Sequence, residues 1–306
     1  MGGFTFVQQG SSSINPVVST LNTVYIYGGT VRSGVSTPRV RGGSVQFNAN
    51  SSGQGEATDN TVYIRGGTIE ANVYGGWLES SSSLLNVLLE AAGNTVYIEG
   101  GIISGGAINP GIYGGSVQFN ADDGQGRATE NTVYLRGGAI SSPHAGLNTN
   151  VYGGRVHVGG ASSISISNVE ATNNTVNIEG GKISHGAAID LELGTSNIYG
   201  GFVSNGTGAG NAIHGMHSIT DNTLNVRSDY LPLATGLPVR TVRNFDFMNF
   251  YLPDNIIPGD IMLTSSVNPA SPAGPAFRSR VFYFTKVDLK LLSGSLANIF
   301  TEGDKI

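Results

Sequence analysis

The sequence contains no cysteine, which excludes disulfide bonds and cysteine-ligated metal sites. Charged residues are scarce, at 12% of the 306 residues, and only 16 residues are Lys or Arg. With a net charge of −5, the chain lacks the clustered positive charge that nucleic acids or anionic membranes require. Its richest apolar run, LLNVLLEAA at 84–92, is interrupted by Asn86 and falls well short of the roughly 18 residues of a membrane-spanning helix.

Glycine, by contrast, is abundant, with 46 residues, and the hydrophobic fraction is 39%. The apolar residues are too many and too regularly spaced for a disordered or collagen-like chain, so a core is expected. The first ten residues, MGGFTFVQQG, lack the basic start and the apolar centre of a signal peptide. We therefore expect that no signal peptide exists or that it has been removed.

A repeated phrase, Asn-Thr-Val/Leu-x-apolar, organises the sequence at intervals of 38, 34, 37, 43 and 48 residues. It starts at Asn22, Asn60, Asn94, Asn131, Asn174 and Asn222. A second phrase, apolar-Tyr-Gly-Gly-x-apolar, follows in most units, as in VYGGRV at 151–156. A third, Glu/Arg-Ala-Thr/Ala, ends four of the connections to the next Asn. Each unit is therefore predicted to contain a strand, a glycine corner, a second strand, a second glycine corner and an excursion, which is a loop of variable length that leads back to the next unit.

Differences between the copies indicate which way each position faces. In the first phrase the third and fifth positions are always Val, Leu or Ile, whereas the residue between them is Tyr in four copies and Asn in two. Alternate residues of a strand point to opposite faces, so Val and Ile are predicted to face a core and Tyr to face outward. The tyrosine of the second phrase is also predicted to face outward, because Arg41 replaces it in one copy.

Units with so few apolar residues can bury a core only by stacking on their neighbours, which favours a β-solenoid. Glycine suits the corners because it adopts left-handed backbone angles without a Cβ clash. The leading Asn can hydrogen-bond the local backbone and stack on the Asn of the next layer. We predict an all-β solenoid of about six repeats over residues 1–228, with one or two coils per repeat left open.

A propeller or a sandwich is the structural alternative, because units near 40 residues also suit propeller blades. Each blade needs four strands, however, and the glycine phrases supply only two or three short ones. The composition then changes near residue 228, since seven of the 11 prolines and seven of the 12 phenylalanines lie beyond residue 229. We predict a Phe/Pro-rich β cap of hairpin type over 229–306, and the ending GDKI leads us to expect that the natural chain continues.

The phrases NTVYIxGGxI and VYGGxV, followed by NFxFxxFYLP and GDIMLT, resemble the passenger region of a bacterial autotransporter of the type V secretion class. The resemblance covers residues 22–306. It implies a right-handed parallel β-helix at the bacterial cell surface, exported through a C-terminal outer-membrane barrel, with a role in adhesion, virulence or as a stalk. The implied partner is a glycan or protein on a host cell or a bacterial surface. The barrel and the export signal of such proteins do not occur in this sequence.

Paired carboxylates were considered as the sign of a polysaccharide hydrolase or lyase, because glycoside hydrolysis uses two of them. Asp122 and Asp123 lie in a glycine-rich excursion whose counterpart at 48–55 carries Asn and Ser, which favours a solvated turn. Asp190 and Glu192 alternate with leucines, as on the polar face of a strand that could bind a cation weakly. No catalytic residue and no cofactor is therefore predicted.

Histidines give no stronger signal for metal binding or catalysis. His214 and His217 lie three residues apart, but the sequence offers no helix signal or cysteine near them. His185 precedes a glycine without the basic partners of a polygalacturonase-like site, and His144 and His157 lack an acidic neighbour for a triad. The chain also lacks a nucleophile elbow and a phosphate-binding loop.

Two predicted tyrosine columns are the candidate binding residues, because Tyr offers a large contact area to sugars or proteins at small entropic cost. The candidate residues are Tyr63, Tyr97 and Tyr134 in the first column and Tyr74, Tyr113 and Tyr152 in the second. The alternative, which we favour, is that the rings stack on each other under the excursions and form a second small core.

The sequence thus favours a non-enzymatic, extracellular β-helical fragment that acts as an adhesin or a structural stalk. A polysaccharide-active enzyme on the same scaffold is the rival interpretation, and it would release reducing ends or unsaturated sugars. A glycan-binding phage tail fibre is a third, and it would form trimers.

Overall fold

The computed structural model describes the chain in segments that together cover most of the repeats. These are residues 3–7, 16–32, 38–47, 53–80, 87–104, 110–119, 124–141, 149–158, 169–184, 196–205, 217–227, 237–239, 241–251, 263–265, 281–285 and 300–302. The described residues form β-strands, turns and bends and include no helix. The chain is therefore an all-β protein, as predicted.

The described strands form five sheets, and neighbouring strands within each sheet pair in parallel. Sheet A contains β1 (Gly3–Val7), β5 (Arg39–Phe47), β9 (Asn72–Ser80), β13 (Gly111–Phe119), β17 (Thr149–Val158), β21 (Ser196–Asn205) and β25 (Thr241–Arg243). Sheet B contains β2 (Val17–Thr20), β6 (Gly53–Thr58), β10 (Val87–Ala92), β14 (Gly124–Thr129), β18 (Val169–Glu170) and β22 (His217–Ser218).

Sheet C is the longest stack in strand number and carries the Asn-Thr-Val phrases. It contains β3 (Thr23–Ile26), β7 (Thr61–Ile64), β11 (Thr95–Ile98), β15 (Thr132–Leu135), β19 (Thr175–Ile178), β23 (Thr223–Arg227), β26 (Phe247–Tyr251) and β28 (Val281–Thr285). Sheet D contains β4 (Thr30–Val31), β8 (Thr68–Ile69), β12 (Ile102–Ile103), β16 (Ala139–Ser141) and β20 (Lys182–Ser184). The fifth sheet contains β24 (Leu237–Val239), β27 (Leu263–Ser265) and β29 (Phe300–Glu302).

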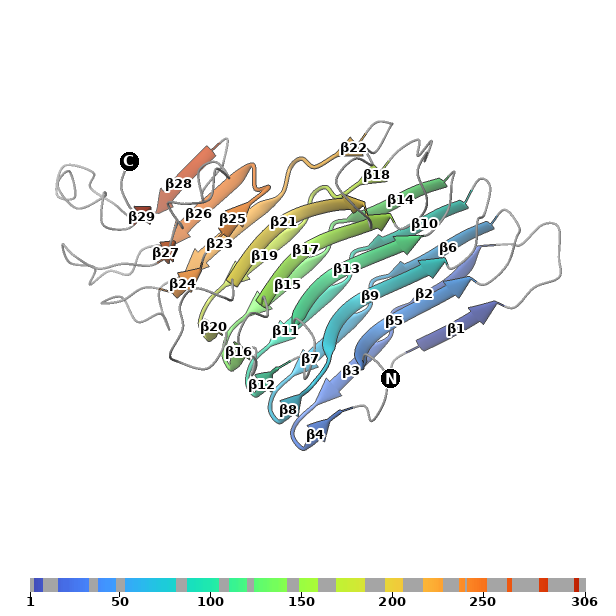
Figure 1. Ribbon diagram of the computed structural model, residues 1–306, viewed down its shortest axis with the longest axis horizontal. Coiled ribbons are helices and arrows are strands. Elements are labelled where there is room, and N and C mark those ends of the chain that lie inside the picture. Colours follow the sequence, from blue (N-terminus) through green and yellow to red (C-terminus); the bar gives the residue numbers. More distant parts are fainter. Residues whose placement is uncertain are drawn as a thin grey trace.

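The chain visits the sheets in a fixed order, so that each strand pairs with the strand four places later over most of the molecule. Figure 1 shows the result as rows of parallel strands stacked along the long axis. We call one passage through sheets B, C, D and A a rung. Strand β7 pairs with β3 on one side and β11 on the other, so one sequence repeat makes one rung. The stacked parallel sheets, with one passage of the chain per repeat, are therefore consistent with the predicted β-solenoid.

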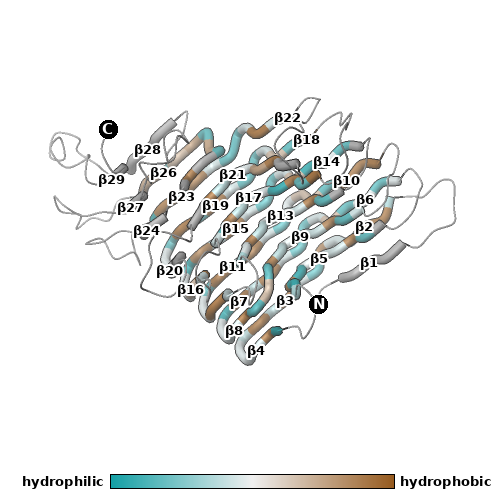
Figure 2. The backbone as a smooth tube through the Cα atoms, viewed as in Figure 1, coloured by the Kyte–Doolittle hydropathy of each residue, from teal (hydrophilic) through white to brown (hydrophobic). Residues whose placement is uncertain are grey.

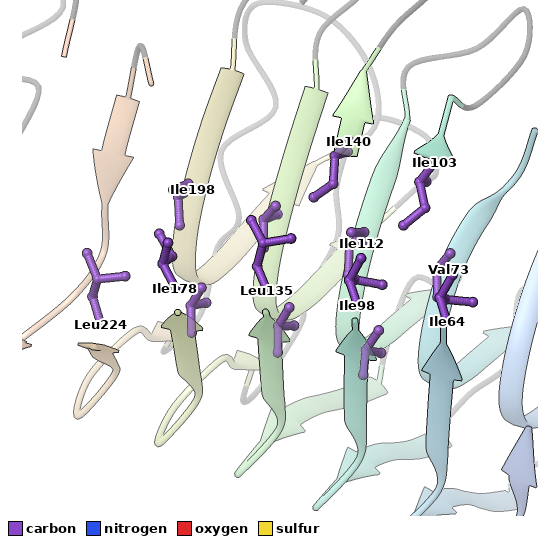
Figure 3. Close-up of a cluster of buried hydrophobic side chains, with 14 of the residues drawn as sticks. Ile64, Val73, Ile98, Ile103, Ile112, Leu135, Ile140, Ile178, Ile198 and Leu224 are labelled. Atoms are coloured by element: carbon purple, nitrogen blue, oxygen red, sulfur yellow. The ribbon is translucent and has the colours of Figure 1, made fainter. Parts of the chain in front are cut away.

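The interior of the rungs is filled by the apolar positions that the sequence comparison assigned to a core. Val62, Val96, Val133 and Leu224 are fully buried, and Figure 3 shows the aliphatic side chains of successive rungs in rows. Polar and apolar residues alternate along these strands in Figure 2, as expected where one face of a sheet is buried. Each buried aliphatic side chain contributes about 1.5–3 kcal/mol to stability.

The leading asparagines form a buried ladder of hydrogen bonds from rung to rung, which confirms their predicted stacking between layers. Asn94 donates from its backbone N and from Nδ2 to Oδ1 of Asn131, at 3.1 and 3.0 Å. Its Nδ2 also donates to the carbonyl oxygen of Ala57 at 2.7 Å. The same pattern recurs from Asn60 through Asn174, and these side chains are fully buried. We call this set the asparagine ladder.

Two kinds of corner turn the chain on either side of the first five strands of sheet C. The second glycine of the Asn-Thr-Val phrase has a positive φ, as at Gly67 (89°) and Gly101 (80°), which confirms the predicted glycine corner. The residue before each ladder asparagine is also left-handed, including Asp59 (54°) and Glu130 (59°). The tight turn before Asn therefore lies one residue earlier than the sequence suggested.

The glycine pair of the second phrase is not a corner, which corrects the prediction. Gly75 and Gly76 lie inside the nine-residue strand β9 and are not among the glycines with a positive φ. A Cβ at Gly76 would overlap the amide of Asn94, and one at Gly115 would overlap that of Asn131. The second phrase needs glycine because the asparagine ladder occupies the space of a side chain.

Beyond residue 228, the described strands continue the parallel stack. Strand β25 pairs with β21, β26 pairs with β23, and β28 pairs with β26, each in parallel. A hairpin requires antiparallel neighbours, so the predicted hairpin-type cap is wrong for the described strands of this region. The apolar residues after 228 instead extend the rows of the core, where Met248 and Phe250 are fully buried.

Candidate functional site

The outer face of sheet C carries a column of stacked tyrosine rings, formed by Tyr25, Tyr63, Tyr97 and Tyr134. We call this set the tyrosine column. Successive ring centroids lie 4.8, 4.6 and 4.6 Å apart, with interplanar angles of 3–6°. This spacing is the distance between neighbouring strands, so the parallel in-register pairing of sheet C creates the stack.

The tyrosine column is partly exposed to solvent. Tyr25 at the first rung is 50% exposed, and the other three side chains are partly buried by their neighbours. Burial, together with Tyr134 and Tyr63, raises the pKa of Tyr97, so its hydroxyl stays protonated at neutral pH. The column therefore offers ring edges and hydroxyl groups. The predicted outward orientation of Tyr63, Tyr97 and Tyr134 is confirmed.

A second column runs beside the first, two residues further along each strand, and alternates in charge. Its members are Tyr27, Arg65, Glu99, Arg136, Glu179, Arg227 and Tyr251. We call this set the charged column. Glu99 pairs with Arg65 at 2.8 Å and with Arg136 at 3.6 Å, and Arg136 pairs with Glu179 at 2.8 Å. The hydrogen bond to Glu99 raises the pKa of Arg65.

The two columns contact each other through their arginines. The guanidinium carbon of Arg65 lies 5.4 Å from the ring centroid of Tyr63, and that of Arg136 lies 4.7 Å from the ring centroid of Tyr134. Such cation–π contacts are worth about 0.5–1 kcal/mol at exposed sites. Arg65 and Arg136 therefore have carboxylate partners within the charged column, whereas Arg227 at its later end forms no such pair with a described residue.

Asparagines take over the tyrosine column in the later rungs. Asn225 donates from Nδ2 to Oδ1 of Asn177, and Asn249 donates from Nδ2 to Oδ1 of Asn225, each at 2.8 Å. These asparagines occupy the same register position as Tyr134. The outer face thus changes from aromatic to amide along the axis, while the strands beneath it keep the same pairing.

The second tyrosine column lies on the outer side of sheet A but is buried there. Tyr74, Tyr113 and Tyr152 are only 4, 6 and 8% exposed, and they form a cluster with Trp77 and the partly buried Tyr199. They therefore lie on the outer side, as predicted, but they do not form an exposed column. The alternative of a second small core is confirmed for this column.

Burial changes the chemistry of these phenols. Desolvation raises the pKa of Tyr113 far above its usual range and that of Tyr152 to about 12. Their rings stack at 4.5–5.1 Å between successive rungs. Tyr74, Tyr113 and Tyr152 therefore act as packing residues, and they are not part of the accessible surface that we consider for binding.

Three arginines surround this buried aromatic cluster. The guanidinium carbons of Arg39 and Arg41 lie 4.7 and 3.8 Å from the ring centroid of Trp77. Arg155 lies 5.5 Å from the ring centroid of Tyr113. Burial, with Arg155 as the second cause, lowers the pKa of His157 to about 4, so this histidine is neutral at pH 7. Sheet A thus carries cations over aromatic rings near its outer side.

No protein-family model, curated protein or solved structure matches this chain.

Most residues considered for catalysis lie outside the described part of the chain. These are Asp122, Asp123, His144, His185, Asp190, Glu192 and His214. His217 begins β22, and its side chain is likewise outside the description. Within the described segments, no group of three or more His, Asp or Glu side chains could hold a metal ion. The same segments contain no helix long and apolar enough to cross a membrane.

The sequence comparison missed the charged column, although its signal is present. The residue before each glycine pair changes from Tyr27 to Arg65, Glu99, Arg136 and Glu179 through successive copies. Comparing that position across the repeats would have revealed the alternation in sign. The interlock of the ladder asparagines with the glycines of sheet A could not be found this way, because those residues meet only in the folded rungs.

Proposed function

We propose that this chain is a right-handed β-helical scaffold of the bacterial cell surface, which acts as an adhesin or a stalk without enzymatic activity. The handedness agrees with the strong preference of parallel strand crossovers for the right hand. The resemblance of the repeat phrases to autotransporter passengers supports the surface location. Its partner is a glycan or a protein on a host cell or a bacterial surface.

The outer face of sheet C is the observation that carries the proposal. The tyrosine column runs over four rungs with ring centroids 4.6–4.8 Å apart, and the charged column, in which Arg65 and Arg136 are paired with glutamates, lies beside it. Tyrosine edges and hydroxyl groups suit contacts with sugar rings or with a protein surface. A repetitive strip of this kind fits extended contact with a polymer or a cell surface better than capture of one small substrate.

Adhesion is tested with beads that carry the purified chain. We expect the beads to bind cells or immobilised surface glycans and to leave polysaccharides intact. The matched variant replaces Tyr63 and Tyr97 by Asn, the residue that occupies the same position at Asn177. Because this position accepts Asn within the same sheet, the variant should fold and should bind at least about fivefold fewer cells, given the loss of two stacked aromatic contacts.

The outcome is read by counting bound beads and by assaying released sugars. If beads that carry the wild-type chain bind cells no better than albumin-coated beads, the adhesive role is refuted. Reducing ends or unsaturated sugars released from any polysaccharide of a panel would overturn the non-enzymatic assignment.

A further inference from the structure

Most described arginines have a carboxylate partner, and the exceptions are informative. The ion pairs are Arg32–Glu70, Arg39–Glu79, Arg65–Glu99, Arg127–Glu170, and Arg136 with both Glu99 and Glu179. Among arginines with described side chains, Arg41, Arg155 and Arg227 form no such pair. Arg227 is exposed, so water solvates its charge, whereas Arg41 and Arg155 are partly buried. A partly buried cation without an anion is unfavourable.

Arg41 belongs to a pair of guanidinium groups that share one aromatic ring. Arg39 and Arg41 lie 4.7 and 3.8 Å from the ring centroid of Trp77, which is itself 1% exposed. The Nε atoms of both arginines are buried and have no hydrogen-bond acceptor. Among the described residues, Ser44 alone accepts a hydrogen bond from Arg41, at 3.2 Å from its Nη1 to the serine Oγ. Trp77 therefore holds both guanidinium groups in place while few acceptors satisfy them.

The positive charge of this pair is only partly balanced. Glu79 is the paired carboxylate, and its nearest contact, to Nη1 of Arg39, is long at 3.9 Å. Burial, with Arg39 as the second cause, lowers the pKa of Arg41 to about 10. Both side chains still reach solvent, since Arg39 keeps 28% of its side chain exposed and Arg41 is partly exposed. An anion arriving from solvent at the exposed part of the two side chains would supply a balancing charge and further hydrogen-bond acceptors.

We propose that Arg39 and Arg41 bind the carboxylate or sulfate group of an acidic saccharide at the outer side of sheet A. Arginine forks match these planar or tetrahedral oxyanions with two parallel hydrogen bonds. Gln46 and Glu79, two register neighbours on the same face, provide polar groups for sugar hydroxyls. The choice of a saccharide as carrier of the anion rests on the proposed adhesive function, whereas the anion site itself does not.

Trp77 makes the site directly observable, because it is the single tryptophan of the chain and touches both arginines. The purified chain is titrated with a heparin tetrasaccharide, with an oligogalacturonate of four residues, and with neutral maltotetraose, while Trp77 emission is recorded. We expect a saturable change of emission with at least one acidic probe and none with the neutral one. Binding to the sulfated probe alone or to the carboxylated probe alone identifies the anionic group.

Variants separate this site from general charge attraction. Arg41→Gln should weaken binding at least tenfold, whereas Arg32→Gln, which removes the same charge from an exposed pair, should change it less than twofold. Arg41→Tyr is the second test, because Tyr74 and Tyr113 fill the same register position and this variant should keep the fold. A silent titration of the wild-type chain, or equal titrations of wild type and a folded Arg41 variant, would overturn the proposal.

The same probes are then added to the bead assay. Cell binding that persists while the Trp77 titration is silent would refute the anion site and leave the adhesive function standing. A saturable titration without cell binding would leave the site standing and remove the adhesive function. The two proposals therefore fail separately.

Discussion

Asn131 shows at the residue scale how a polar side chain can hold two rungs together. Its Oδ1 accepts from two nitrogens of Asn94, and its Nδ2 donates to the carbonyl oxygen of Ala91 and to Oδ1 of Asn174. Replacing Asn131 by Ala leaves several of these buried groups unsatisfied, so we expect a loss of about 3 kcal/mol in the free energy of unfolding. Urea denaturation measures it.

The matched control for this variant is Asn225→Ala on the outer face. Asn225 also hydrogen-bonds the asparagines before and after it in its column, but water can replace those partners because its side chain is only partly buried. We expect Asn225→Ala to lower the free energy of unfolding by less than about 1 kcal/mol. Equal losses in the two variants would show that the buried ladder has no special role in stability.

Gly115 tests the steric side of the same contact. A Cβ there would overlap the Asn131 amide, although Gly115 does not have a positive φ. Gly115→Ala should therefore cost about 2–3 kcal/mol through overpacking alone. Gly28→Ala is the control, because nothing lies within 4 Å of its added Cβ. Gly28→Ala should change the free energy of unfolding by less than about 0.5 kcal/mol. If Gly115→Ala has no larger effect, the tight contact between Gly115 and the Asn131 amide is contradicted.

His157 gives the chain a pH dependence with a defined sign. Its pKa is about 4 in the folded chain and about 6.5 in the unfolded chain. Between these values the unfolded state binds a proton that the folded state does not, so stability is complete above pH 6.5 and falls toward pH 4. We expect the free energy of unfolding to fall by about 2 kcal/mol between pH 6.5 and pH 4. This is less than the whole pKa difference would give, because the ring is partly exposed.

His157→Gln isolates that contribution, since Gln118 occupies the same register position in the preceding rung. Urea midpoints of both proteins are compared at pH 7, 5.5 and 4. Carboxylates contribute equally to the two curves, so the difference between them belongs to His157. Parallel curves would mean that His157 titrates normally in the folded chain.

At the scale of elements, the charged column explains how neighbouring parallel strands of sheet C present charge without repulsion. Glu99 on the turn after β11 lies between Arg65 and Arg136, one rung away on either side. Glu99→Lys would place three cations in a row about 4.8 Å apart. We expect the free energy of unfolding to fall by about 1 kcal/mol at low salt. Most of this loss should vanish at about 0.5 M salt because exposed charges are screened.

The comparison for Glu99→Lys is Glu70→Lys, which disturbs only the single pair with Arg32. Thermal unfolding at two salt concentrations measures both variants. A loss at Glu99 that is no larger than at Glu70, or that does not depend on salt, would show that the column acts as isolated pairs or through packing.

At the scale of the whole molecule, each rung is a module that can be removed. Deleting residues 94–130 takes out β11, β12, β13 and β14, one strand from each of sheets A to D. Gly93 would then lead into Asn131, which can accept the hydrogen bonds that Asn60 now donates to Asn94. We expect a folded chain, shorter by about 4.8 Å along its axis. Circular dichroism and small-angle scattering measure these two properties.

Deleting only residues 94–110 is the control for modularity. This shorter deletion removes β11 and β12 but leaves β13 and β14 without strands of sheets C and D in their rung. The rows of core side chains and the asparagine ladder would be interrupted, so this variant should unfold at a lower temperature than the longer deletion. The reverse order of stability would contradict a stack of equivalent rungs.

Much of this arrangement could be predicted from the sequence, because repetition makes each copy a control for the others. Val133 and Leu135 were predicted to face the core, Tyr134 to face outward, and Gly138 to turn the chain, and all three predictions are confirmed. The register follows from the same repetition, since a slip by one residue would move every apolar side chain to the outer face.

The sequence by itself determined the all-β class, the repeat and the two faces of each sheet C strand, since these depend on local alternation of side chains. Only the tertiary structure decided that Tyr113 is buried while Tyr97 is partly exposed, because both follow an aliphatic residue in a strand and differ in what packs over them. It also decided the role of Gly115 and the meeting of Arg39 and Arg41 over Trp77. Gly115 meets Asn131, and Arg39 and Arg41 meet Trp77, only where the stacked strands bring these residues together.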